Sequence, residues 1–276
     1  MILINGEPNN QIDSADRGLQ YGDGLFETIA VINGRPVFWD RHWQRLQQGC
    51  QRLYLPLPDA SVISQEVERL CWHKPSSAVL KIIVTRGVGG RGYRLPENIA
   101  PTRILSLHPY PDYPSNYAEF GIRARFCQTR LGLNPILAGI KHLNRLEQIM
   151  ARAEWQDPSI QEGILLDYND RVIEGTMSNL FYAKDAALYT APIIEAGVSG
   201  VVRGLILELA EAHGLSAHEQ AFGKTELLSA DEIFICNSII GVWPLICLGA
   251  AIFPVGPCTR RIQGWFSSFT QEALNR

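Results

Sequence analysis

The amino-acid sequence predicts a strand-rich α+β fold made of two α/β domains, and three observations support this prediction. Short runs of alternating apolar residues occur in both halves of the 276-residue chain, as expected for strands. Apolar residues at helical spacing lie between these runs. A stretch rich in proline and tyrosine at 110–117 can continue neither kind of element. We therefore expect a small N-terminal domain over 1–110, an interdomain linker over 111–120 and a larger C-terminal domain over 121–276.

The first domain is expected to contain four main strands and two helices. Asn33 and Gly34 follow an apolar segment and favour a tight hairpin. Apolar residues recur at helical spacing from Trp39 to Leu53, and Asp59 is a plausible N-cap for a second helix. The strands are predicted at 3–8, 25–32, 79–87 and 103–110.

The second domain is expected to begin with a strand and a loop that lead to Lys141. Apolar residues at helical spacing predict a helix over 142–155, so Lys141 is placed at a loop-to-helix junction. Asn169 and Asp170 have the character of turn residues between two antiparallel strands. The other predicted elements are strands at 121–127, 163–175, 179–190 and 231–237, a helix at 201–214 closed by a glycine, and a terminal helix.

Composition favours a soluble protein that acts on small molecules. Hydrophobic residues make up 46% of the chain, the formal net charge is −3 and the pI is near 6.1, so a general attraction to nucleic acid or to an anionic membrane is not expected. The start of the chain lacks the features of a signal peptide, and no apolar run approaches the ~18 residues of a membrane span. We expect a cytoplasmic protein. The six cysteines form no CxxC pair and the six histidines no HExxH motif, so neither disulfides nor a metal site are expected.

A glycine-rich segment at 87–92 matches the GxGxxG pattern of dinucleotide-binding proteins. That pattern requires a helix directly after the glycines, but the sequence runs through Tyr93 to Pro96 and soon returns to a strand, which excludes such a helix. Two interpretations remain: a plain hairpin tip, or a flexible loop in which Arg86, Arg91 and Arg94 bind carboxylates.

Three weaker signals point to an anion and to amine chemistry. The segment GVSGVVR at 197–203 runs into an amphipathic helix whose N-terminus could bind phosphate, although many helices begin this way only to cap themselves. Arg45 lies off the apolar stripe of its helix and by default is a surface charge. Lys141 has apolar neighbours, and partial burial would lower the pKa of its amine and favour the neutral nucleophile.

Several spaced motifs together resemble the fold-type IV pyridoxal-phosphate enzymes, a family that includes aminotransferases and lyases. Residues 174–181 read EGTMSNLF, 188–190 read LYT and 198–203 read VSGVVR, and an N-terminal block at 16–28 is also similar. The resemblance covers nearly the whole chain. It implies two α/β domains with the cofactor, pyridoxal 5′-phosphate, at their interface, a C-terminal domain that binds most of it, and a homodimer.

The resemblance also implies roles for individual residues. Lys141 would form a Schiff base with the cofactor and act as the catalytic base. Glu174 would keep the pyridine nitrogen protonated, so that the ring can accept electrons. The residues implied in phosphate binding are Arg45, the amides of Val201 and Val202, and Ser238.

Two segments, 86–93 and 139–148, are most similar to the branch of the family that converts 4-amino-4-deoxychorismate to 4-aminobenzoate and pyruvate in folate biosynthesis. Several aminotransferases of the family have a tyrosine five residues after the lysine, where this chain has Leu146. Transamination of D-amino or branched-chain amino acids is the first alternative, and a non-enzymatic metabolite-binding protein is the second. The residues implied in substrate binding are Arg86, Arg91, Tyr93 and Thr28.

Overall fold

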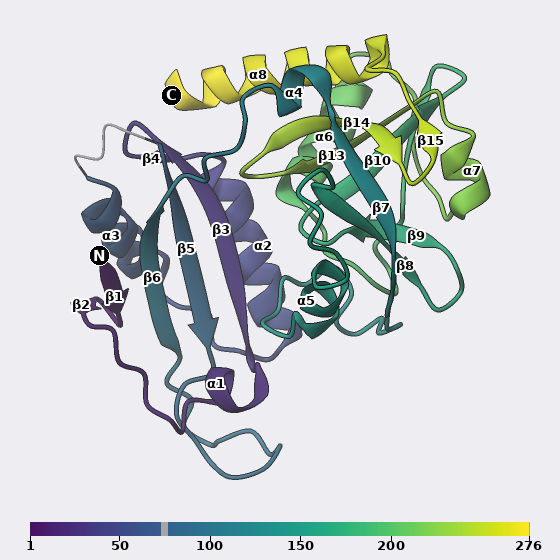
Figure 1. The fold of residues 1–276 in the computed structure, drawn as a ribbon. Coiled ribbons are helices and arrows are strands. Elements are labelled where there is room, and N and C mark those ends of the chain that lie inside the picture. Colours follow the sequence, from purple (N-terminus) through teal and green to yellow (C-terminus); the bar gives the residue numbers. More distant parts are fainter. Residues whose placement is uncertain (73–76, 276) are drawn as a thin grey trace. The chain divides into compact units, whose positions relative to one another are not determined.

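In a computed structural model, residues 1–72 and 77–275 are described, and the chain divides into two compact units (Figure 1). The first unit contains Met1–Pro111, and the second contains most of the remaining chain, Asp112–Gly139 and Arg145–Glu272. Two further segments, Ile140–Asn144 and Ala273–Arg276, belong with the first unit. Both units combine a sheet with helices, which confirms the predicted α+β class.

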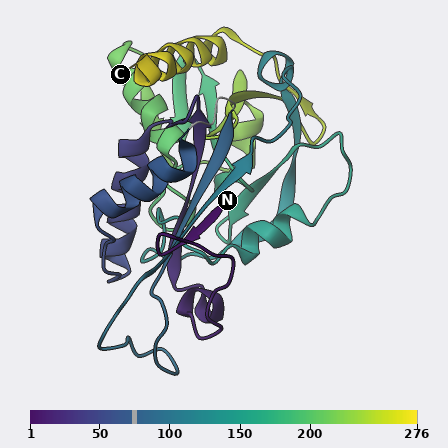
Figure 2. The same cartoon turned by 90° about the vertical axis from the view of Figure 1, so that its left-hand side faces the viewer.

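The first unit is an antiparallel sheet with helices α2 (Trp39–Arg52) and α3 (Ala60–Cys71) packed on one face (Figures 1 and 2). A short helix, α1 (Arg17–Tyr21), precedes strand β3. The strand order is β2-β1-β6-β5-β3-β4. Their bounds are β1 (Ile2–Ile4), β2 (Glu7–Pro8), β3 (Gly24–Ile32), β4 (Arg35–Pro36), β5 (Ala78–Thr85) and β6 (Thr102–Pro109).

Local sequence signals are confirmed in this unit. Asn33 and Gly34 connect β3 to β4, and their φ angles of 50° and 78° are those of a tight hairpin turn, with Ile32 opposite Arg35. The Asp59 carboxylate caps α3 by accepting hydrogen bonds from the amides of its first turn. Each signal depends on a few consecutive residues, which is why it could be found in the sequence.

The second unit contains strands that form a closed circuit. Strand β9 pairs with β8 on one side and with β10 on the other, so the path β10-β13-β14-β7-β8-β9 returns to its start. Such closure leaves these strands without a free edge. The bounds are β7 (Ile122–Leu131), β8 (Glu162–Asp167), β9 (Val172–Gly175), β10 (Asn179–Lys184), β11 (Ala187–Thr190), β12 (Ala217–Glu219), β13 (Glu232–Asn237), β14 (Gly241–Leu248) and β15 (Ala251–Ile252).

Helices α6 (Val201–Ala212) and α8 (Pro257–Asn275) share a core with one face of this sheet. The rings of Phe181 and Phe234 stack at 5.1 Å between centroids, and Ile206 and Ile262 are fully buried in the same cluster. This packing fixes α6, whose N-terminus was a candidate anion site. The shorter helices are α4 (Tyr117–Phe120), α5 (Leu146–Arg152) and α7 (Lys224–Leu228). No helix in 1–72 or 77–275 is long and apolar enough to cross a membrane.

The helix predicted over 142–155 is wrong at its N-terminal end. Helix α5 begins only at Leu146, and Lys141 lies in an extended segment whose backbone pairs with β3. The helical pattern of the sequence does not reveal this pairing, because the partner strand lies far away in the chain.

The six cysteines are free and buried, and burial suppresses their reactivity. Burial raises the pKa of Cys50, Cys127 and Cys236 to about 12 and that of Cys71 to about 11. At pH 8 these thiols are therefore protonated, and we expect almost no reaction with Ellman's reagent in the native protein. All six should react after unfolding in urea. Rapid labelling of two or more thiols under native conditions would contradict this prediction.

Candidate active site

Lys141 is held beside the start of β3 by backbone hydrogen bonds. Its carbonyl oxygen accepts from the amide of Phe26 at 3.0 Å, and the amide of Leu143 donates to the carbonyl of Gly24 at 3.0 Å. The Lys141 Nζ lies 4.3 Å from the centroid of the Phe26 ring. The lysine therefore has a fixed backbone and an aromatic surface against its amine, a setting that suits a reactive amine.

A close approach of α2 supports this segment. A Cβ added at Gly49 would lie 2.8 Å from the Leu25 side chain and 3.3 Å from that of Ile140. Only glycine leaves room for the helix to pack against both side chains. The residue next to Lys141 is thereby buried between helix and strand.

Arg45 is not the solvated surface charge that its place on the helix suggested. Its Nε donates to Glu27 Oε1 at 2.8 Å and its Nη2 to Glu27 Oε2 at 2.5 Å. His42, one turn earlier on α2, lies with Nδ1 2.6 Å from the same Oε2. Glu27 is 2% exposed and His42 is fully buried. A buried carboxylate of β3 thus binds two basic side chains of one helix.

The charges of this cluster follow from the opposing effects of burial and contact. Burial raises the pKa of Glu27, but the charge and hydrogen bonds of Arg45 and the hydrogen bond of His42 outweigh burial and lower it to about 2. Burial lowers the pKa of His42 and outweighs the opposite effect of Glu27. At neutral pH Glu27 is ionised and His42 is neutral, so Nδ1 carries the proton donated to Glu27.

Arg86, predicted to bind substrate, is buried and bonded within the first unit. It donates from Nε and Nη2 to the Asp23 carboxylate, at 2.7 and 3.0 Å, and to the carbonyl oxygens of Leu53 and Tyr54. Arg17 also donates to Asp23, at 3.0 Å. These bonds lower the pKa of Asp23 against the effect of its burial. They give Arg86 a structural role, and its role toward a substrate stays a prediction.

The other predicted substrate residues lie at two places in the first unit. Arg91 and Tyr93 are exposed in the long loop between β5 and β6, which extends away from the sheet in both views (Figures 1 and 2). The loop is tied to the unit where Arg17 Nη1 donates to the carbonyl of Gly92 at 2.9 Å. Thr28 is half-buried on β3, opposite Lys81 of β5.

Glu174 lies on β9 of the second unit and is 4% exposed. Its Oε2 accepts a hydrogen bond from the amide of Val198 at 2.8 Å, and its Oε1 lies 3.5 Å from Gln148 Nε2. A Cβ at Gly197 would lie 3.2 Å from Glu174 Oε2, and the φ angle of Gly197 is +86°. A glycine is required there both by the backbone and by the approach of the carboxylate.

The turn that follows Glu174 is held by a second buried carboxylate, that of Glu162 on β8. Glu162 Oε1 accepts from the amide and the hydroxyl of Thr176, and Oε2 accepts from the hydroxyl of Ser178 at 2.7 Å. Glu162 is fully buried. The threonine and serine of the EGTMSN motif therefore donate hydrogen bonds to Glu162, and these bonds fix the connection from β9 to β10.

Replacing Glu162 with alanine should lower the free energy of unfolding by about 3 kcal/mol, because two hydroxyls and two amides, those of Gly163 and Thr176, would lose a charged partner inside the protein. Urea unfolding followed by circular dichroism measures this loss. Glu211→Ala, at an exposed position of α6, is the matched control and should change the stability by less than about 0.5 kcal/mol. A loss below 1 kcal/mol for Glu162→Ala would be evidence against the role of Glu162.

The N-terminus of α6 lies at the same end of the sheet as Glu174. Asn179, opposite Glu174 in the β9–β10 pairing, donates from Nδ2 to the carbonyl of Val198 at 2.9 Å. A Cβ at Gly200 would lie 2.0 Å from Asn179 Oδ1, so only glycine fits at the N-cap. Among the residues that the structure describes, no side chain caps this helix, and the amides of its first turn, from Val201 and Val202, suit an anion.

Ser238 follows β13 in the turn before β14. Cys236, two residues earlier, is opposite Asn179 in the β10–β13 ladder, and the Asn237 side chain donates to the carbonyl of Met177 at 3.0 Å. Within the second unit, the structure thus brings Glu174, the start of α6 and the Ser238 turn to one end of the sheet.

The residues of each unit fit the pyridoxal phosphate that the sequence implies. The first unit holds Lys141 and Arg45 on neighbouring elements, and His42 Nε2 is a buried polar atom with no hydrogen-bond partner in the described part of the chain. The second unit holds a helix N-terminus without a side-chain cap and the buried carboxylate of Glu174 next to Gln148. The buried Oε1 of Gln148 also has no hydrogen-bond partner among the described residues. Phosphate, pyridinium and aldehyde each find a suitable chemical partner in this set.

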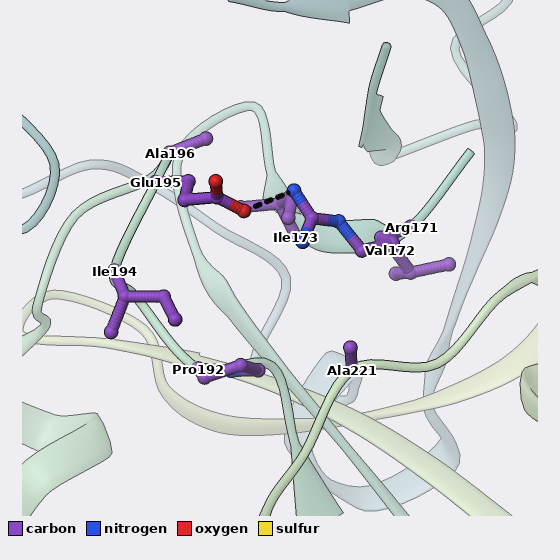
Figure 3. Close-up of a pocket in the computed structure, with 8 residues that line it drawn as sticks. All are labelled: Arg171, Val172, Ile173, Pro192, Ile194, Glu195, Ala196 and Ala221. Carbon is purple, nitrogen blue, oxygen red and sulfur yellow. Dashed lines mark ion pairs between the residues drawn. The ribbon is translucent and has the colours of Figure 1, made fainter. Parts of the chain in front are cut away.

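A pocket in the second unit is a separate feature. Figure 3 shows Arg171 and Glu195, which line it, pointing toward one another in an ion pair of 2.6 Å. None of the predicted site residues lines it. Its lining residues are Arg171, Val172, Ile173, Pro192, Ile194, Glu195, Ala196 and Ala221. Over 1–72 and 77–275, no group of three or more His, Cys, Asp or Glu side chains could hold a metal ion.

Glu27, His42 and Glu162 were missed by reasoning from the sequence. Glu27 had a usable signal, because strand alternation places it on the face of Leu25 and Ile29, which are apolar. A carboxylate on the buried face of a strand requires a hydrogen-bond donor or a positive charge beside it. Glu162 had no such signal, since its partners are hydroxyls of a later turn.

Comparison with known proteins places this chain in a family. Residues 24–246 match the amino-transferase class IV family, and the chain belongs to that family, which confirms the resemblance found in the sequence. It is 38% identical to an aminodeoxychorismate lyase of Vibrio harveyi over 96% of this chain and 98% of the relative. The crystal structure of 4-amino-4-deoxychorismate lyase from Pseudomonas aeruginosa matches with a TM-score of 0.94 and 44% identity, covering 97% and 98% of the two chains.

Aminotransferases of the family are also similar, at lower identity. A D-alanine aminotransferase of Bacillus licheniformis is 31% identical over 95% of this chain and 94% of the relative. The branched-chain amino acid aminotransferase of Escherichia coli matches with a TM-score of 0.84 and 28% identity, covering 98% and 95% of the chains.

Proposed function

We propose that this protein is a pyridoxal-phosphate-dependent lyase that converts 4-amino-4-deoxychorismate to 4-aminobenzoate and pyruvate, a step of folate biosynthesis. The observation that carries the proposal is the difference in identity. Lyases are 38% and 44% identical over nearly the full length, whereas the aminotransferases compared above reach 28% and 31%. The fold is shared by both classes and does not by itself decide the reaction.

The cofactor would be held by residues of both units. Lys141 would bind it covalently, Arg45, Ser238 and the first amides of α6 would bind its phosphate, and Glu174 would partner its ring nitrogen. When bound, pyridoxal phosphate supplies an aldehyde that joins an amine and a protonated ring that takes up negative charge. The buried carboxylate of Glu174, which accepts a hydrogen bond from the Val198 amide, would hold a proton on that ring nitrogen.

Lys141 would then act on the substrate in two ways. Its Nζ would make way for the substrate amine and would take the proton from the ring carbon that bears this amine. The bond between the substrate ring and the enolpyruvyl oxygen breaks, the oxygen leaves with the electron pair, and protonation gives pyruvate. The ring becomes aromatic, which makes the elimination strongly favourable. The substrate carries two carboxylates, and we propose Arg91, with Tyr93, Thr28 and Arg86, as the residues that bind it.

Product analysis tests the reaction. The purified protein with pyridoxal phosphate is given aminodeoxychorismate made in situ, and separately D-alanine with 2-oxoglutarate. We expect 4-aminobenzoate in the first assay, detected by its fluorescence, and no glutamate in the second. Pyruvate alone does not separate the two reactions, because transamination of D-alanine also forms it. Glutamate formation without 4-aminobenzoate would favour the aminotransferase, and no borohydride-reducible chromophore would favour a binding protein.

We also propose a homodimer that acts in the cytoplasm. The resemblance to fold-type IV enzymes supports the dimer, and helix α5 exposes Leu146, Ile149 and Met150, which lie on one helical face and are each more than half exposed. The six free cysteines suit a reducing compartment. A monomer in light scattering would contradict the dimer.

A further inference from the structure

We infer that Glu27 and His42 are positioning residues for Arg45, which fix its guanidinium for binding the cofactor phosphate. The inference rests on the proposed function, because it takes Arg45 to be a phosphate ligand. Its own basis is the geometry of the first unit. Nε and Nη2 of Arg45 meet the two oxygens of Glu27 at 2.8 and 2.5 Å. Two parallel hydrogen bonds define the plane of the guanidinium as well as its position.

The carboxylate that orients Arg45 is itself fixed on both sides. Glu27 lies within β3, where it is opposite Ile82 in the ladder, and it is 2% exposed. His42 Nδ1 contacts Glu27 Oε2 at 2.6 Å from the same helix as Arg45, three residues earlier. Positions three apart lie on one helical face. Glu27 therefore joins one face of α2 to strand β3 of the sheet.

The same strand also holds the reactive lysine. The amide of Phe26 donates to the carbonyl of Lys141 at 3.0 Å, and Phe26 is the residue next to Glu27. One residue of β3 thus holds Lys141 through its backbone, and the next holds Arg45 through its side chain. Two consecutive residues of β3 therefore hold the backbone of Lys141 and the guanidinium of Arg45.

The protonation states agree with this role. Glu27 has a pKa lowered to about 2, so that it accepts hydrogen bonds at any physiological pH. His42, with its pKa lowered by burial, is a neutral donor and adds no charge. Removing the charge of Glu27 would have two opposed effects on a phosphate: it would remove a nearby negative charge, and it would release Arg45. A glutamine would also point an N–H₂ group at an N–H donor of Arg45, so at least one of the two contacts must break. The inference predicts that the loss of orientation is larger.

Binding of pyridoxal phosphate and of pyridoxal, which lacks the phosphate, to the apo-protein tests the inference without a substrate. The measured quantity is the dissociation constant for pyridoxal divided by that for pyridoxal phosphate, obtained for each variant from absorbance titrations. A high ratio means a strong preference for the phosphorylated compound. In Glu27→Gln we expect this ratio to fall by at least about tenfold, the loss expected from one hydrogen bond to a charged group. The dissociation constant for pyridoxal should stay unchanged. A ratio equal to or above that of the wild type would overturn the inference.

Two further variants separate positioning from a general structural effect. Glu66→Gln removes the charge of another buried carboxylate of the first unit that is paired with an arginine, Arg103, at 2.7 Å, and it should leave the ratio unchanged. Arg45→Lys should lower the ratio by itself, and adding Glu27→Gln to it should lower the ratio no further. An equal second loss in the double variant would show that Glu27 acts independently of Arg45 and would overturn the inference.

Two other outcomes can be told apart from failure of the inference: a Glu27→Gln protein that does not fold, and failure of the proposed function. If Glu27→Gln does not fold, Glu27→Asp keeps the charge but withdraws the carboxylate by one methylene, and it should lower the ratio in the same direction. An unchanged ratio in Glu27→Asp would then overturn the inference. If the wild-type protein binds neither compound, or shows no preference for the phosphorylated one, the proposed function itself fails and the inference fails with it.

Discussion

Replacing Lys141 with alanine is expected to abolish both the visible absorbance of the bound cofactor and the release of pyruvate. The lysine is the covalent anchor and also the base, so the loss in turnover should exceed a factor of about 10⁴. The purified variant is incubated with pyridoxal phosphate, desalted and scanned, and 4-aminobenzoate formation is then followed by fluorescence.

Lys81→Ala provides a matched control for the absorbance. Lys81 belongs to the same unit, and its Nζ lies 5.7 Å from the centroid of the Phe26 ring that also contacts Lys141. Because Lys81 lies on β5 and has no predicted bond to the cofactor, this variant should keep the chromophore. A Lys141→Ala protein that still formed 4-aminobenzoate at the normal rate would show that the proposed mechanism is wrong.

Replacing Glu174 with glutamine should reduce turnover by about 100-fold while the cofactor stays bound. The glutamine keeps the shape of the side chain but is neutral, so the ring nitrogen loses the negative charge that keeps it protonated. The ring then accepts electrons less readily. The measurement is kcat for 4-aminobenzoate formation at saturating pyridoxal phosphate, together with the absorbance spectrum, which should shift but persist.

The control for Glu174→Gln is Glu195→Gln in the same unit. Glu195 is paired with Arg171 beside the pocket of Figure 3 and has no predicted role in the reaction. It should retain kcat within about twofold. If Glu174→Gln also retained kcat within twofold, the assignment of Glu174 to the ring nitrogen would be rejected.

The parts of the fold that the sequence predicts are those set by neighbouring residues. The Asn33–Gly34 turn and the Asp59 cap each depend on a few consecutive positions, and both are confirmed. The start of α5 is different, because the pairing of residues 141–143 with β3 replaces the first turns of the predicted helix. Tertiary pairing of this kind overrides local helical spacing.

The candidate site shows the same distinction. Family motifs supplied Lys141 and Glu174, and chemistry gave each a role. The residues that hold them in place could not be found this way, because their partners are distant in the sequence. Arg86 shows a different limit: the sequence predicts from its type that it binds a carboxylate of the substrate, but does not reveal that its guanidinium also binds the carboxylate of Asp23.

The assignment of Ile140–Asn144 to the first unit has a consequence for how the protein can be divided. The chain leaves the second unit after Gly139 and returns to it at Arg145. A fragment that ended at Pro111 would therefore lack Lys141 and the backbone partner of Phe26. A fragment that began at Asp112 would carry the lysine but not the strand against which it folds. Neither fragment would contain both the lysine and the strand that it pairs with, so a single cut in the chain cannot separate the two units.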